Sequence, residues 1–316
     1  MSDLAPLDDD DRAAWEIEVV SKPFTTGCED TGIAVGRLRE EGNRHDWDLV
    51  IGLTELPLRG DDGRYLLIQV DSQRRTAVLS LPALGGLRRH ARTRHALSQL
   101  VSGMAGSTAP AEHRVPLPRR RGRWRLLLGM VLANRPWLLV PGLKTALVAA
   151  LTTGAIATVN STIWVLAGSL AWWRLLVASI GSVALVVAWL VIDGELWDRP
   201  EVPSVEAKER SRLYNTSTLL TLTTGVVICY LALYLVNLVW ALFILDPRVM
   251  GSSVHSSLGY GELFTLTWFV ASAATIGGAL GSGLESDEAI RAAAYSKREE
   301  ERRNRLAGGD EGRDRD

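Results

Sequence analysis

The chain has 316 residues, of which 22% are charged, and its formal net charge at pH 7 is −1. These averages resemble those of a soluble protein, but polar residues gather at both ends and apolar residues fill the middle, which excludes a uniformly soluble chain. The two cysteines, Cys28 and Cys229, lie far apart without metal-ligand spacing, so neither a disulfide framework nor a thiolate site is expected.

The first 12 residues form an acidic segment that we expect to be disordered, and no early apolar run indicates a signal peptide. Residues 13–104 alternate short apolar runs with charged connections, which predicts a small cytosolic domain of the α+β class with a mixed sheet. Strands are predicted at 15–20, 48–53, 64–70 and 76–81. Helices are predicted at 31–41, ending at Gly42, and at 87–104.

The order of segments in this domain resembles the archaemetzincin type of zinc peptidase. The strings DLVIGLTELPL and TAVLSLPALGG, followed by an arginine-rich run and RHALSQLVSG, are similar to that family's strands before its H-E-x-x-H helix. The resemblance covers roughly residues 47–103 and implies a zincin-like fold in which the second string is an edge strand.

The same resemblance places Ser98, Gln99 and Ser102 where the zinc-binding histidines and the catalytic glutamate would lie. Two imidazoles one helical turn apart bind zinc and the glutamate activates water, and neither serine nor glutamine supplies this chemistry. We therefore expect no catalytic residue, no metal and no cofactor, and a degenerate, catalytically inactive domain. A small α/β domain that carries SQLVS by coincidence is the alternative.

Residues 105–123 have the composition of a linker and end in a basic run, and residues 124–140 are apolar but broken by Asn134-Arg135-Pro136. We expect 124–140 to form a helix at the membrane interface, because its apolar halves are too short to span. The residues expected to contact anionic headgroups, rather than nucleic acid, are Arg119, Arg120, Arg121, Arg123, Trp124 and Arg125.

Residues 141–283 are predicted to form an all-α bundle of four transmembrane helices, at 143–167, 170–192, 216–245 and 263–283. The third of these contains thirty residues without a charged side chain. Lysine and arginine concentrate before the first span, between the second and third, and in the charged tail 284–316. The positive-inside rule then places both termini in the cytoplasm, and the composition suggests a bacterial plasma membrane.

Small residues in the fourth span follow two parallel four-residue repeats, which predict close packing within the bundle or with a partner. The repeats are Ala273, Gly277 and Gly281, and Ala274, Gly278 and Ser282. Asn160 and Asn237 both fall toward the outer half of the membrane, where they could hydrogen-bond each other.

These features predict a multi-pass membrane protein that acts as a scaffold or regulator of another protein, or through self-association, rather than as an enzyme. Two alternatives stay open at this point. One is a membrane-bound metallopeptidase with ligands that the sequence does not reveal. The other is a small-solute or ion channel or transporter subunit, although no ionisable side chain lies at mid-span.

Overall fold

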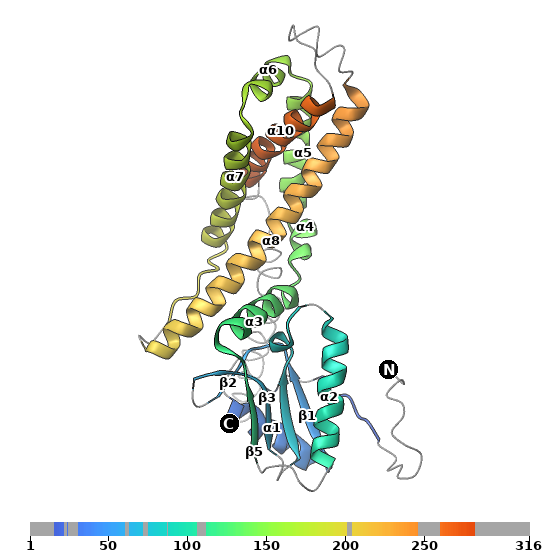
Figure 1. Cartoon of the computed structure of the whole chain (residues 1–316), viewed down its shortest axis with the longest axis vertical. Helices are drawn as coiled ribbons and strands as arrows, with labels where there is room; N and C mark the ends of the chain where they lie inside the picture. The colour runs from blue at the N-terminus through green and yellow to red at the C-terminus, as the bar shows by residue number, and fades with distance from the viewer. Residues whose placement is uncertain are drawn as a thin grey trace, which may run out of the picture.

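The computed structural model describes residues 16–21, 24, 31–60, 63–71, 75–86, 88–105, 112–200, 204–245 and 260–281. Two regions are visible in Figure 1: a head that contains the sheet, and an elongated helical bundle. The predictions for the acidic segment 1–12, for Ser282 and for the tail 284–316 fall outside the described residues.

A mixed sheet of five strands forms the centre of the head. The strands are β1 (Val50–Thr54), β2 (Leu58–Arg59), β3 (Tyr65–Asp71), β4 (Thr76–Ser80) and β5 (Glu112–Pro116). Strand β1 is parallel to β4, whereas β2, β4 and β5 are each antiparallel to β3. The expected mixed sheet is thus confirmed. The string TAVLS, an edge strand in the zincin resemblance, lies between β1 and β3.

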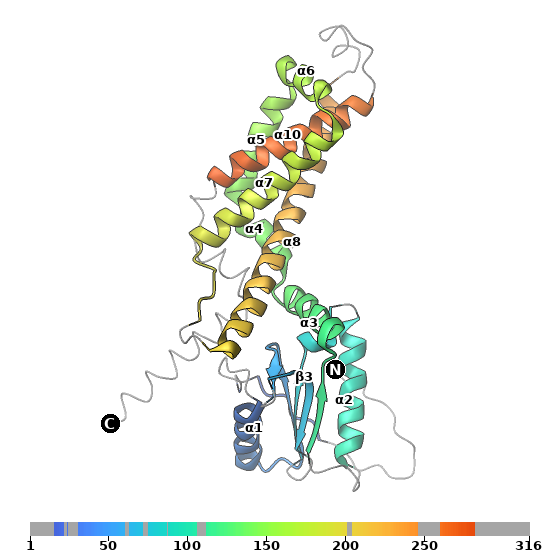
Figure 2. The same cartoon turned by 60° about the vertical axis from the view of Figure 1, so that its left-hand side comes forward.

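Two helices cover the faces of this sheet, as Figure 2 shows: α1 (Thr31–His45) on one side and α2 (Arg89–Ala105) on the other. Strand β4 supplies both cores, because successive side chains of a strand point to opposite faces. Its Ala77 and Leu79 belong to the cluster that includes α2, and its Val78 belongs to the cluster that includes α1.

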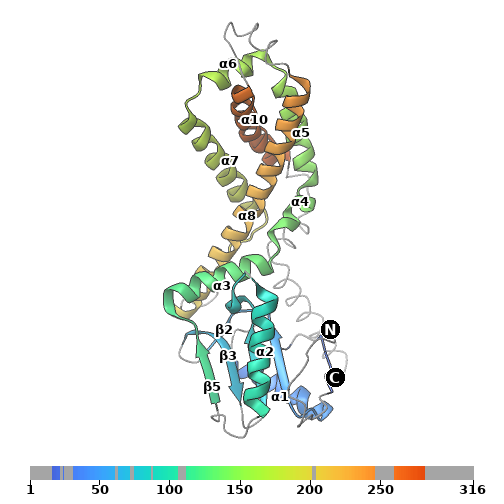
Figure 3. The ribbon, with the colours of Figure 1, turned by 45° about the vertical axis from the view of Figure 1, so that its right-hand side comes forward.

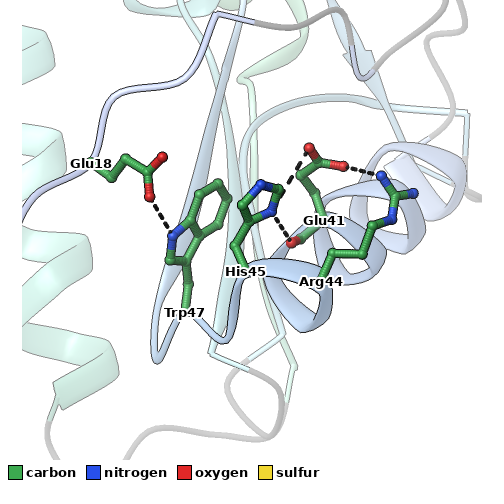
Figure 4. A network of polar contacts seen from close by, with 5 residues as sticks. All are labelled: Glu18, Glu41, Arg44, His45 and Trp47. Carbon is green, nitrogen blue, oxygen red and sulfur yellow. Dashed lines mark hydrogen bonds and ion pairs between the residues drawn. The ribbon is translucent and has the colours of Figure 1, made fainter.

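The strand predicted at 15–20 is wrong, because residues 16–21 adopt no regular secondary structure. In this segment, the Glu18 carboxylate accepts a hydrogen bond from Trp47 Nε1 at 2.8 Å. Trp47 stacks on His45 with the ring centroids 4.6 Å apart, and the two side chains lie beside each other in Figure 4. Helix α1 also continues past the predicted stop at Gly42, and Gly42 lies inside it against Val50.

The predicted linker 105–123 contains regular structure, since β5 pairs with β3 and a helix begins at Arg119. That helix, α3 (Arg119–Ala133), lies across the junction of head and bundle in Figure 1. The short helix η2 (Pro82–Leu84) contacts it so closely that a Cβ added to Gly129 would lie 2.1 Å from the Pro82 carbonyl oxygen. The chain then turns through η3 (Pro136–Leu138) and α4 (Leu139–Gly142), at the predicted break.

The bundle consists of α5 (Lys144–Thr158), α6 (Ser161–Ser169), α7 (Trp172–Asp193), α8 (Val205–Ile244) and α10 (Tyr260–Gly281). Figure 3 shows α10 between α5 and α7, and α10 contacts both of these helices and α8. Among the described residues, two helices are long and apolar enough to cross a membrane: Trp172–Asp193 and Ala207–Ile244. A third crossing would arise if the segment Arg121–Gly142 and α5, which meet at a bend of 56°, form one span.

The first predicted span, 143–167, is not one continuous helix, because it breaks between Thr158 and Ser161. Asn160 adopts an extended conformation there, and its side-chain oxygen accepts a hydrogen bond from the Thr162 backbone N–H. An asparagine that caps a new helix in this way competes with continuation of the old one. The predicted hydrogen bond between Asn160 and Asn237 is therefore replaced by local bonds, since Asn237 Nδ2 donates to the Leu233 carbonyl.

Candidate membrane-surface and intrabundle sites

Helix α3 presents two different faces at the junction of head and bundle. Its buried face carries Leu126, Leu127 and Met130, which pack against Ala83 of η2 and Tyr214 of α8. Its other face is exposed and contains the residues that were predicted to contact headgroups. Of that set, Arg121, Arg123, Trp124 and Arg125 are exposed, and the side chains of Arg119 and Arg120 lie outside the described part.

An acidic side chain from the bundle neutralises one side of α3. Glu209, near the start of α8, lies 3.7 Å from Arg123 of α3 and 3.8 Å from Arg59 of β2. One carboxylate therefore connects the head, the junction helix and the longest helix of the bundle. No sequence pattern predicts this contact, because the three residues are far apart along the chain.

The other side of α3 brings two arginines together. Arg125 Nε donates to the Leu84 carbonyl oxygen at 3.1 Å, and Arg92 Nη1 of α2 donates to the same oxygen at 2.8 Å. Partial burial, and next the positive charge of Arg92, lower the pKa of Arg125 from its ordinary value. The arginine run at the start of α2 predicts a positively charged surface, but only the fold brings Arg92 and Arg125 to the same carbonyl oxygen.

Inside the bundle, three hydroxyl groups from three helices form a compact polar cluster. Ser179 Oγ of α7 lies 3.0 Å from Tyr230 OH of α8 and 3.1 Å from Ser272 Oγ of α10. Tyr230 OH and Ser272 Oγ are 2.9 Å apart, and Trp268 Nε1 donates to Ser179 Oγ at 2.6 Å. This hydroxyl cluster joins α7, α8 and α10. In the sequence Ser179 is one of several small polar residues of the predicted spans, and no pattern points to Tyr230 or Ser272 as its partners.

Asn237 is the other buried polar side chain of interest in the bundle. It is fully buried on α8, and its Oδ1 has no hydrogen-bond partner in the described part of the chain. A Cβ added to Gly154 of α5 would lie 2.4 Å from this oxygen, so the amide packs directly on the α5 backbone. Asn237 thus fixes a close α5–α8 contact.

The two small-residue repeats of α10 face different surroundings. Ala274 and Gly278 are buried against α5, where a Cβ added to Gly278 would lie 2.9 Å from the Ala146 carbonyl oxygen. Ala273 is exposed, and a Cβ on Gly277 would meet nothing within 4 Å. The repeat with Ala274 and Gly278 is therefore an internal contact, whereas Ala273 and Gly277 face outward.

The positions of the zincin resemblance lie on the exposed face of α2. Ser98, Gln99 and Ser102 are exposed, while Ala96, Leu100 and Met104 of the same helix are buried against the sheet. Ser98 Oγ donates to the His95 carbonyl, and Ser102 Oγ donates to the Ser98 carbonyl. Within the described ranges, no group of three or more histidine, cysteine or acidic side chains could hold a metal ion.

Comparison of the chain with protein-family models, with curated proteins and with solved structures finds no match.

Proposed function

We propose that the protein is a multi-pass membrane protein whose catalytically inactive, zincin-like head scaffolds or regulates another protein. In this proposal the chain crosses a bacterial plasma membrane four times, and the head and both termini face the cytoplasm. The apolar helices support insertion, because many of their large side chains are exposed to the surroundings of the bundle. Examples are Val177, Ile180, Val239 and Phe243.

The observation that carries the regulatory role is the continuity between head and bundle. Helix α8 is a single helix of 40 residues that runs from the junction to the far end of the bundle. Its Leu213 and Tyr214 share one buried cluster with Leu126 of α3 and Ala83 of the head. A displacement of the head would therefore be transmitted directly to α8, because packed interiors resist deformation.

The head also offers a surface on which a partner protein can bind. Strand β1 pairs only with β4 among the described strands, so its other edge is open to an added strand. Apolar side chains are exposed in this part of the head, with Leu53 on β1 and Ile17 and Val19 in the segment anchored by Trp47. Charged residues are the usual protection of such an edge, so exposed apolar residues favour a binding role.

Site-specific photo-crosslinking in native membranes tests the proposal. A crosslinkable residue placed at Val19 or Leu53 should capture one protein reproducibly, and the same residue at exposed Arg94 of α2 should not. Capture of a second copy of this chain would identify self-association as the mode of action. Absence of any product at Val19 and Leu53, or equal capture from all three positions, would contradict a partner-binding head.

A further inference from the structure

We propose that Arg92 and Arg125 form a binding site for the phosphate group of an anionic phospholipid at the junction of head and bundle. The site combines one residue of the head with one residue of α3, so lipid binding would fix how the head sits on the membrane. The inference rests on the proposed membrane insertion, but not on the partner-binding role of the head.

The first argument is geometric. The two guanidinium groups come from different helices and meet on one acceptor, the Leu84 carbonyl oxygen. Gly85, the next residue, has a positive φ of 82°, and a Cβ there would lie 2.8 Å from Arg125 Cγ and 3.2 Å from Arg92 Nη1. The backbone at Gly85 thus lies close to both arginine side chains, and a larger residue there would displace them.

The second argument concerns charge. Neither Arg92 nor Arg125 has a carboxylate within ion-pair distance in the described part of the chain, although nearby arginines do. Arg89 pairs with Glu55 at 3.1 Å, and Arg123 pairs with Glu209 at 3.7 Å. Two adjacent cations without a carboxylate repel each other, and a shared anion would convert this repulsion into attraction.

The third argument is the chemistry of the free donors. Each guanidinium uses one N–H on the Leu84 carbonyl and keeps the others for a further acceptor. A phosphate group offers several oxygens that fit the planar guanidinium fork, and such charge-assisted hydrogen bonds are short and strong. Both side chains are also exposed, so an anion can reach them.

The surroundings favour a lipid as the source of the phosphate. Trp124 and Leu128, on the same helix as Arg125, are 62% and 55% exposed. Tryptophan is enriched at the level of lipid headgroups, and an exposed leucine one turn away fits the boundary with the acyl chains. A soluble phosphate compound would gain nothing from these two apolar side chains.

The test uses the full-length protein in neutral detergent, with binding of short-chain phosphatidylglycerol measured by native mass spectrometry. Arg92→Gln and Arg125→Gln should each weaken binding at least about fivefold, the contribution of one basic residue near a headgroup. Two matched controls, Arg94→Gln and Arg123→Gln, each remove one positive charge. Arg94 lies on α2 away from the pair, and Arg123 lies on α3 but is already paired with Glu209. These controls should change the affinity by less than about twofold, because exposed or neutralised charges are screened.

Several outcomes would overturn the site. Equal weakening by Arg94→Gln would indicate general surface charge, and equal binding of phosphatidylcholine would remove the need for an anionic lipid. Competition by inorganic phosphate, at concentrations comparable with the lipid, would assign the site to a soluble ligand. Arg92→Lys and Arg125→Lys keep the charge but lose the fork, and full retention of affinity by both would contradict the geometric argument.

Loss of folding is distinguished from loss of binding by thermal unfolding of each variant without lipid. If Arg125→Gln unfolds early, Arg92→Gln decides the question, because Arg92 lies on α2, outside the helix α3 whose buried face joins head and bundle. Lipid affinity and photo-crosslinking are independent measurements. A failure of the lipid site would therefore leave the partner-binding proposal intact, and the reverse also holds.

Discussion

The hydroxyl cluster shows how a few polar atoms specify the arrangement of apolar helices. Ser179 Oγ and Ser272 Oγ are each within hydrogen-bond distance of a carbonyl on their own helix, Leu175 and Trp268 respectively. If both serines donate to those carbonyls, the Tyr230 hydroxyl and the Trp268 indole supply the protons that join the helices. Ser179 is then the acceptor for the Trp268 indole, and its loss leaves this part-buried N–H without that acceptor, whereas the Tyr230 hydroxyl still has Ser272 Oγ within hydrogen-bond distance.

We predict that Ser179→Ala lowers the free energy of unfolding more than Tyr230→Phe does. Tyr230→Phe removes one interhelical hydrogen bond, worth about 0.6 kcal/mol inside a membrane. Ser179→Ala also strands the Trp268 N–H, which adds about 1–3 kcal/mol. Unfolding by a denaturing detergent measures both effects.

The control for this comparison is Ser169→Ala, because Ser169 is exposed and its hydroxyl donates only to Leu166 of its own helix. It should leave the unfolding midpoint unchanged. Equal stability of Ser179→Ala and Ser169→Ala would show that the cluster does not hold the three helices together.

Among the elements of the bundle, α10 contacts α5, α7 and α8, and at Gly278 it comes close to the backbone of α5. Small residues allow this approach, since association inside a membrane depends on packing rather than on the hydrophobic effect. Gly278 of its inward repeat approaches α5, whereas in its outward repeat Ala273 is exposed and a Cβ on Gly277 would meet nothing within 4 Å in the described part of the chain. The sequence shows both repeats equally, so only the rotation of the helix assigns their roles.

We predict that two neighbouring substitutions in α10 differ in their effect on stability. Gly278→Leu would force α10 away from the Ala146 carbonyl and should destabilise the bundle by about 1–3 kcal/mol. Gly277→Leu meets open space and should leave the unfolding midpoint unchanged. Denaturing-detergent titration of both variants measures the difference, and equal destabilisation would mean that the helix is rotated differently. A reduced oligomer content of Gly277→Leu alone would identify the outward repeat as a self-association surface.

At the scale of the whole molecule, the head and the bundle behave as connected parts. Helix α3 contacts η2 closely, the cluster around Leu126 and Tyr214 is continuous across the junction, and Glu209 of α8 contacts Arg59 of the head. The head therefore lies at the end of the bundle at which α8 begins.

We predict that the end of the bundle that carries the head lies in the cytoplasm. With Cys28 and Cys229 replaced, a single cysteine at Arg94 in the head should resist membrane-impermeant thiol reagents in intact cells and react after lysis. A cysteine at Arg174, in the first turn of α7 at the opposite end of the bundle, should react in intact cells. Labelling of the head from outside would reverse the orientation that the basic segments predict.

Much of the fold follows from local patterns. The strands predicted at 48–53, 64–70 and 76–81 and the helices predicted at 31–41 and 87–104 correspond to β1, β3, β4, α1 and α2 within a few residues. The errors have physical causes. The segment predicted as a strand at 15–20 alternates like a strand but pairs with none of the described strands, and β5 lies in a segment of linker composition but pairs with β3. Pairing is decided by residues distant in the chain, so it overrides local preference.

The amino-acid sequence by itself determined that a polar head precedes long apolar helices, because hydrophobic periodicity and length are properties of consecutive residues. Only the tertiary structure decided which side chains meet: Arg92 with Arg125, Glu209 with Arg123, and Ser179 with Tyr230 and Ser272. Each of these contacts joins separate elements, whose relative rotation and approach depend on packing and are not encoded in any single segment.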